Sequence, residues 1–215
     1  MNLLALALAN IRSNALASVL NALLMSVGVG TVVLLMLFAS QTEQRMSRDA
    51  AGVDLVVGAK GSPVQLILST LYHADIPTGN IDYAEAKRWA GHSLVKKAIP
   101  QSLGESWRGF RIVGTTPEYL DLYGGQLTTG RVWQASHEAV VGAAVAEAGL
   151  TLGKQFSGVH GLALEGHAHD EKQYSVVGIL EPTGTVLDRL ILTSLESVWL
   201  LHGHETHGHD EAADG

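Results

Sequence analysis

The chain reads SNALASVLNALLMSVGVGTVVLLMLFASQT over residues 13–42, thirty consecutive positions without Asp, Glu, Lys or Arg. A helix needs about 20 apolar residues to cross the hydrocarbon core of a bilayer. Residues 15–40 supply that length, and lipid favours a helix because every backbone amide must be satisfied internally. The stretch therefore predicts a transmembrane helix that attaches the rest of the chain to a membrane.

Two other interpretations of this stretch fit less well. A cleaved signal peptide has an apolar core of roughly 7–15 residues and a small-x-small cleavage site, whereas this core is longer and ends at Leu37-Phe38-Ala39. A buried helix of a soluble core is rarely this long without a charge. Arg12 precedes the span, and Arg45 and Arg48 follow it, so counting basic residues leaves the orientation open.

The composition restricts the function of the remaining part of the chain. About 170 residues follow the span, enough for one domain or two small subdomains. The net charge of −7 argues against a nucleic-acid partner, which would require a basic surface. The absence of cysteine excludes a disulfide framework. The 24 glycines and few aromatic residues favour a domain with strands and tight turns.

The pattern after the span predicts a mixed α+β domain. We expect strands over residues 54–58, 94–103, 107–114, 138–142 and 190–192, with a turn at Gly104-Glu105 and a hairpin formed by 156–164 and 173–180. We expect helices from Pro63 to about residue 72, from the Asp82 capping box to about residue 89, from Thr116-Pro117-Glu118 to residue 122, and over 143–148 and 194–201.

Several ordered motifs resemble one family. The chain opens with Leu6-Ala7-Leu8-Ala9-Asn10-Ile11-Arg12-Ser13-Asn14 directly before the apolar span. Further matches are EAVVGAAVAE over 138–147, LGKQF over 152–156, and YSVVGILEPTGT over 174–185 followed by Asp188-Arg189. Each motif alone is weak, but the ordered set resembles MacB/FtsX-type ABC transporter permeases, which include the lipoprotein-releasing permeases, and covers nearly the whole chain.

The resemblance implies an organisation and a set of partners. It implies a cytoplasmic amphipathic segment over 1–14, a transmembrane helix over 15–40 and a MacB-like periplasmic core domain over 41–201. The composition marks residues 202–215 as a His-rich acidic tail that we expect to be disordered. The resemblance also implies a place in the cell inner membrane, a cytoplasmic ATP-binding subunit as partner, a permease dimer and a periplasmic partner protein. Such permeases return through three more transmembrane helices, and no second stretch of bilayer length follows Ala39. We therefore expect a fragment, an interrupted reading frame or a specialised anchored domain.

Histidines give the main chemical signal, since seven of the ten follow residue 159. Imidazole is a favoured ligand of zinc and other transition metals, and carboxylates can complete the coordination shell. The alternative is that both tracts are solvated polar loops. The residues expected to bind metal lie in two groups, one at the tip of the 156–180 hairpin and one in the tail: His160, His167, His169 and Asp170; and His202, His204, His207 and His209.

The remaining polar residues do not form a recognisable catalytic set. His73, His92 and His137 are expected to be ordinary surface or helix-end residues. The chain has no Gly-x-Ser-x-Gly or His-Glu-x-x-His motif, and Gly58-Ala59-Lys60-Gly61-Ser62 lacks phosphate-loop spacing. We therefore expect no enzyme. Two functions remain open: a permease subunit driven by a partner ATPase, or a membrane-anchored periplasmic module that binds metal or protein without transporting anything.

Overall fold

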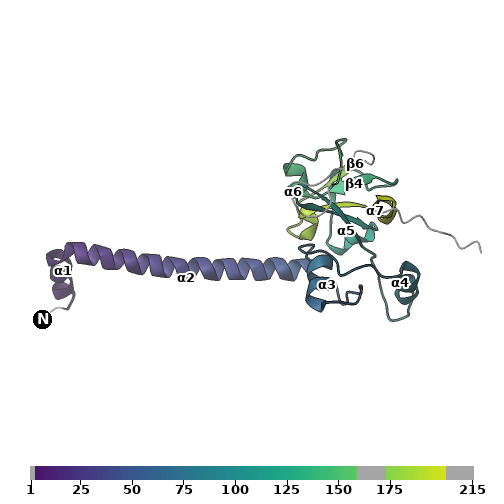
Figure 1. Cartoon of the computed structure of the whole chain (residues 1–215). Coiled ribbons are helices and arrows are strands. Elements are labelled where there is room, and N and C mark those ends of the chain that lie inside the picture. The colour runs from purple at the N-terminus through teal and green to yellow at the C-terminus, as the bar shows by residue number, and fades with distance from the viewer. Residues whose placement is uncertain (1–2, 159–172, 202–215) are drawn as a thin grey trace, which may run out of the picture. The chain divides into compact units, whose positions relative to one another are not determined.

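The computed structural model describes residues 3–158 and 173–201, and these residues divide into two compact units, Met1–Ser47 and Arg48–Gly215. The first unit contains α1 (Leu3–Ser13) and most of α2 (Ala15–Asp49), with a turn at Asn14 between the two helices. At 1.5 Å per residue, the 35 residues of α2 extend over about 52 Å (Figure 1). Within the described part of the chain, α2 is the one helix long and apolar enough to span a membrane.

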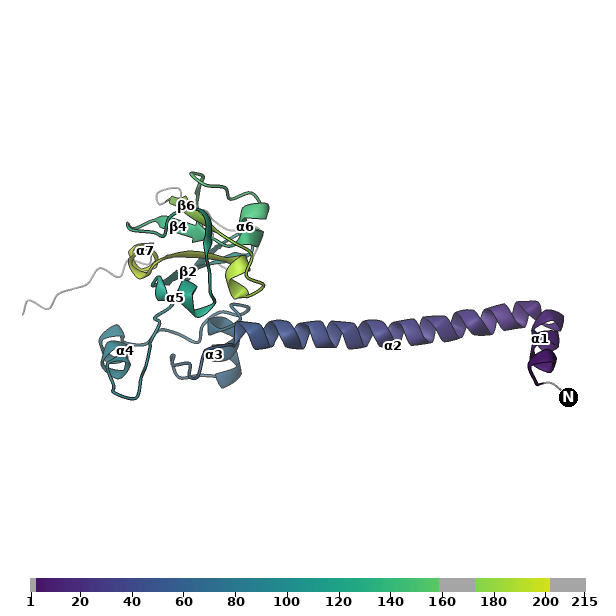
Figure 2. The ribbon, with the colours of Figure 1, turned by 180° about the vertical axis from the view of Figure 1, so that it is seen from behind.

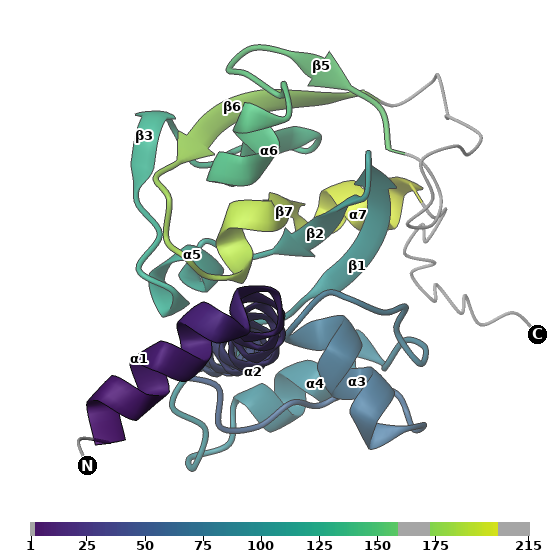
Figure 3. The same cartoon turned by 90° about the vertical axis from the view of Figure 1, so that its left-hand side faces the viewer.

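The second unit is built around one sheet whose strands follow the order β1-β2-β7-β4-β6-β3, with β5 pairing to β6 (Figures 1 and 3). Two of the pairs, β2 with β7 and β4 with β6, are parallel, and the other pairs are antiparallel. The strands are β1 (Ser102–Trp107), β2 (Phe110–Thr115), β3 (Leu127–Gly130), β4 (Glu138–Val141), β5 (Gln155–Phe156), β6 (Tyr174–Leu180) and β7 (Leu190–Ser194).

Side chains from both faces of this sheet are buried. Along β7, Leu190 and Leu192 join one apolar cluster while Ile191 joins the other, because successive side chains of a strand point to opposite faces. The first cluster also contains residues of α5 (Glu118–Leu122) and of the 3-10 helix η1 (Val186–Arg189). The second contains Val145 of α6 (Ala143–Glu147). These central strands therefore form the core of a mixed α+β unit, which confirms the expected fold class.

Two further helices, α3 (Pro63–Thr70) and α4 (Tyr83–Ala90), lie on the far side of the second unit from α6 (Figures 1 and 2). Both begin where the sequence predicts. Ser62 caps α3 with Pro63 in its first turn, and the Asp82 carboxylate accepts a hydrogen bond from the Glu85 amide at 2.7 Å. The last helix, α7 (Leu195–Leu201), follows β7 directly.

The structure corrects three expected elements. Residues 54–58 form no strand, and Leu55 and Val57 are exposed, because this short apolar run has no strand to pair with. Residues 94–101 are also outside the sheet, and β1 starts only at Ser102. The turn between β1 and β2 lies at Arg108-Gly109, where both residues have a positive φ, and not at Gly104-Glu105.

Candidate functional site

The residues expected to bind metal lie outside the described part of the chain. This applies to His160, His167, His169 and Asp170 of the hairpin and to His202, His204, His207 and His209 of the tail. Among the residues that the structure describes, no group of three or more His, Asp or Glu side chains could hold a metal ion. The described polar residues that do gather belong to two other clusters.

The first cluster surrounds the end of α2 within the second unit. Asp49, the last residue of α2, is only 4% exposed, and its carboxylate Oδ2 lies 2.5 Å from Nη2 of Arg189. Its backbone carbonyl accepts a hydrogen bond from the Tyr123 hydroxyl at 2.8 Å. The Arg189 side chain is 44% exposed, so the ion pair is partly screened by water. The last residue of α2 is therefore held by two side chains from α5's end and η1.

The loop before Arg189 explains how that arginine is positioned. The Asp188 carboxylate accepts hydrogen bonds from the amides of Thr183 and Gly184, at 2.7 and 2.8 Å. Thr185 caps η1 by accepting from the Leu187 amide at 3.3 Å. The hydrogen bonds to Asp188 thus fix the loop over residues 181–189. Arg189, the residue after Asp188, is thereby positioned to pair with Asp49.

A glycine allows η1 to approach α6 closely. A Cβ at Gly142 would overlap the carbonyl oxygen of Leu187, which is backbone and cannot rotate away. The Gly142 amide also donates to the Leu190 carbonyl at 2.9 Å. Any side chain at Gly142 would therefore displace the segment that carries Arg189.

Aromatic and imidazole groups extend the cluster inward from Tyr123. The Tyr123 and Tyr119 rings meet edge to face at 5.3 Å, and the Tyr119 hydroxyl lies 3.0 Å from Nε2 of His73. We call Asp49, Arg189, Tyr123, Tyr119 and His73 the helix-end network. It joins the end of α2 to α5, η1 and the loop after α3.

His73 differs from the expectation that it is an ordinary surface or helix-end residue. It is 6% exposed, has a positive φ of 50°, and its Nδ1 has no hydrogen-bond partner among the described residues. Burial, followed by the positive charges of Arg111 and Arg189, lowers the pKa of His73 to about 3. Arg111 itself donates to the Asp75 carbonyl at 2.8 Å and so fixes the loop that contains His73. The imidazole is therefore neutral at physiological pH.

The second cluster lies where the predicted histidine hairpin leaves the sheet. Glu105 of β1 is buried, and its carboxylate packs against the backbone of Gly158, the last described residue before the hairpin tip. Tyr174 of β6 is fully buried, and burial and then the charge of Glu105 raise the pKa of its hydroxyl. The His137 ring lies 5.6 Å from the Tyr174 ring. This cluster offers one carboxylate and one imidazole, too few for a closed metal site.

Sequence reasoning missed both clusters. Asp49, Tyr123 and Arg189 are far apart in the chain, and only the Asp188-Arg189 pair within a motif pointed toward them. Glu105 was assigned to a turn, and its burial follows from the shifted start of β1. His92 is exposed just after α4, as expected for a surface or helix-end residue.

One family model and two solved structures are similar to this chain. A family model described as the MacB-like periplasmic core domain matches residues 18–210. Among solved structures, the periplasmic region of MacB from Actinobacillus actinomycetemcomitans is 15% identical, with a TM-score of 0.46 and coverage of 67% of this chain and 65% of that one. The extracellular domain of the noncanonic ABC-type transporter YknZ from Gram-positive bacteria is also 15% identical, with a TM-score of 0.42 and coverage of 57% and 67%. No curated protein matches the chain. The chain spans 65% of the MacB periplasmic region, which is less than two thirds of its length.

Proposed function

Because this chain belongs to the family of MacB-like periplasmic core domains, we propose that it serves as the membrane anchor and extracytoplasmic domain of an ABC transporter permease. The family match over residues 18–210 is the observation that carries the proposal. The most apolar 18-residue segment of α2 is not buried within the structure, and this supports an attachment of α2 to the inner membrane. The domain would then lie in the periplasm and α1 in the cytoplasm.

In this proposal the chain contributes no catalytic group. ATP hydrolysis belongs to a cytoplasmic ATP-binding subunit, and a second copy of the permease completes the working unit. The helix-end network supports a coupling role, because an ion pair and a hydrogen bond hold the last residue of α2 to η1 and to the end of α5. Substrate transport and force transmission to a periplasmic partner are both compatible with such a role.

The test uses the ATP-binding subunit encoded nearest to this chain in its genome. We expect that subunit to co-purify with the full chain and to change its ATPase rate at least about twofold when the chain is present in nanodiscs. Ile11→Asp should weaken co-purification about tenfold, since loss of one interface anchor costs on the order of 1–2 kcal/mol. Ile11 is 55% exposed in α1, so the change should leave the fold intact.

The control for this test is Ile81→Asp, a similar change at a 43% exposed position in the second unit. If no ATP-binding subunit is encoded nearby, or if the encoded subunit does not co-purify with the unaltered chain, the permease proposal is wrong. The chain would then be a membrane-anchored periplasmic module that binds metal or protein. If both variants bind the subunit as the unaltered chain does, only the contact at Ile11 is ruled out.

The histidine tracts motivate a second function, the binding of zinc or another transition metal. Histidine-rich tracts are a composition typical of metal binding. We expect isothermal titration of the full chain in detergent with zinc to give saturable heat. Changing the seven histidines that follow residue 159 to alanine should remove most of that heat, while His73→Asn/His92→Ala/His137→Asn should not. Equal heats from the unaltered chain and the seven-histidine variant would refute metal binding by these tracts.

A further inference from the structure

One surface of the second unit combines positive charge with exposed apolar side chains. We call Lys87, Arg88, Trp89, Leu94, Lys96 and Lys97 the α4 surface; all six are exposed, with Trp89 at 59% and Leu94 at 88%. Residues 83–97 contain four cations and a single carboxylate, Glu85, which lies 3.5 Å from Arg88. No residue of α4 is buried. Because exposed apolar patches of this kind mark interaction sites, the α4 surface is a candidate docking surface.

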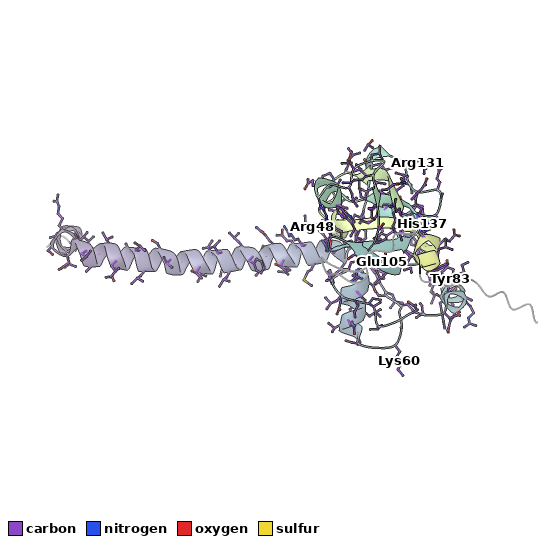
Figure 4. The ribbon with its side chains drawn as sticks, turned by 45° about the horizontal axis from the view of Figure 1, so that its top comes forward. Arg48, Lys60, Tyr83, Glu105, Arg131 and His137 are labelled. Atoms are coloured by element: carbon purple, nitrogen blue, oxygen red, sulfur yellow. The ribbon has the colours of Figure 1, made fainter. Side chains whose placement is uncertain are left out.

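Two contacts fix the α4 surface, one to α7 and one to α5. Tyr83 lies on α4 (Figure 4). Its ring packs edge to face against Trp199 of α7, with ring centroids 4.9 Å apart. Lys97 donates to the Glu118 carbonyl at 3.3 Å. The helix α7 ends at Leu201, two residues after Trp199, so this described segment ends close to α4.

The positive charge of the α4 surface favours an acidic segment as its binding partner. Residues 202–215 contain four carboxylates, Glu205, Asp210, Glu211 and Asp214, and no Lys or Arg. Residues 101–201 contain eleven carboxylates and six cations, so they repel such a segment on balance, whereas the α4 surface attracts it. Ten extended residues reach about 33 Å, which is ample for neighbouring elements.

From this complementarity and proximity we propose that the acidic tail segment, residues 202–215, docks on the α4 surface of the same chain. Each exposed ion pair is worth only about 0.2–1 kcal/mol. The tail is tethered at α7, however, and a short tether gives an effective concentration on the order of millimolar, so several weak pairs suffice. The proposal does not depend on metal binding or on a transport function.

The experiment exploits the absence of native cysteine. Ala84 is exposed on the helical face shared with Lys87 and Arg88, so Ala84→Cys is paired with Gly208→Cys in the full chain, held in neutral-lipid nanodiscs. We measure the initial rate of disulfide formation. Lys87→Glu/Arg88→Glu should lower this rate about fivefold, and adding Glu205→Lys/Glu211→Lys to that variant should restore it. Raising the salt concentration should lower the rate of the original pair.

The matched control is Arg108→Glu/Lys154→Glu, which makes the same charge change at exposed cations outside the α4 surface. This control should form the disulfide at the same rate as the Ala84→Cys/Gly208→Cys chain without further changes. Equal rates in the reversal and control variants would overturn the proposal. Two other results would also overturn it: quenching of Trp89 by brominated anionic lipid, which would assign the surface to lipid, or a cross-link between two chains, which would assign it to a second copy.

Discussion

Two arginines in the middle of α2, Met25→Arg and Val29→Arg, should remove the chain from the membrane. Arginine at the centre of a transmembrane helix costs about 2.5–3.5 kcal/mol on the insertion scale. The two side chains lie four residues apart on one face, and both native residues are exposed, so no described protein group would compensate the charges. The combined cost of about 5–7 kcal/mol shifts the insertion equilibrium by roughly four orders of magnitude. The measurement is the fraction of chain that stays in the membrane pellet after carbonate extraction.

The same charge change near the polar end of α2 serves as the control. Ser40→Arg/Gln44→Arg has the same spacing, but it lies beyond the most apolar part, where long arginine side chains can reach water. We expect this variant to pellet like the unaltered chain. If the Met25/Val29 variant also resists carbonate extraction, the prediction that two central arginines remove α2 from the membrane is wrong.

The prediction of a long helix was correct for α2, whereas the prediction of a strand over residues 54–58 was wrong, although both segments are apolar. A run of thirty residues without a charge predicts a long helix from its length alone, because that length is enough to cross a bilayer. A five-residue apolar run predicts a strand only if a partner strand is available, and nothing local identifies that partner. Local chemistry was more informative for α3 and α4, where Ser62, Pro63 and Asp82 set the helix starts within a few residues.

The helix-end network shows why the site was harder to predict than the fold elements. Asp49 and Arg189 are 140 positions apart, and their pairing depends on the fold bringing η1 to the end of α2. In the sequence, Asp49 is one of several charges after the span, and its burial cannot be deduced from its neighbours. The same holds for His73, which follows α3 in the sequence and is buried beside Tyr119, 46 positions further along the chain. Such long-range contacts are a property of topology rather than of local pattern.

Acid should destabilise the second unit through His73. The folded pKa of His73 is lowered to about 3, against 6.5 for the unperturbed side chain, so below pH 6.5 the unfolded state binds a proton that the folded state excludes. Stability contributed by the neutral imidazole is complete above pH 6.5 and falls as the pH drops toward 3. From these two values the loss is about 2 kcal/mol at pH 5 and about 3 kcal/mol at pH 4.

The variant His73→Asn isolates this contribution. Asparagine tolerates the positive φ of this position and does not titrate. Its shorter side chain loses the bond that Nε2 makes to the Tyr119 hydroxyl, but that loss does not depend on pH. Denaturant unfolding of the full chain in detergent, followed by tryptophan fluorescence between pH 7.5 and 4, gives the free energy of unfolding. We expect the unaltered chain to lose about 3 kcal/mol more than His73→Asn over this range.

Carboxylates also contribute to acid unfolding, and the comparison between the two proteins removes their effect. Hydrogen bonds from Arg131 and from the Gln134 amide lower the pKa of Glu138 to about 2, so the stability that Glu138 provides is likewise lost in acid. Glu138 is present in both proteins, and its loss cancels in the difference. Parallel pH profiles would therefore mean that the folded protein accepts a proton at His73 at no cost, which requires that water or a carboxylate reach Nδ1. A steeper profile in the unaltered chain alone would show that protonation of the buried imidazole beside Tyr119 destabilises the folded protein.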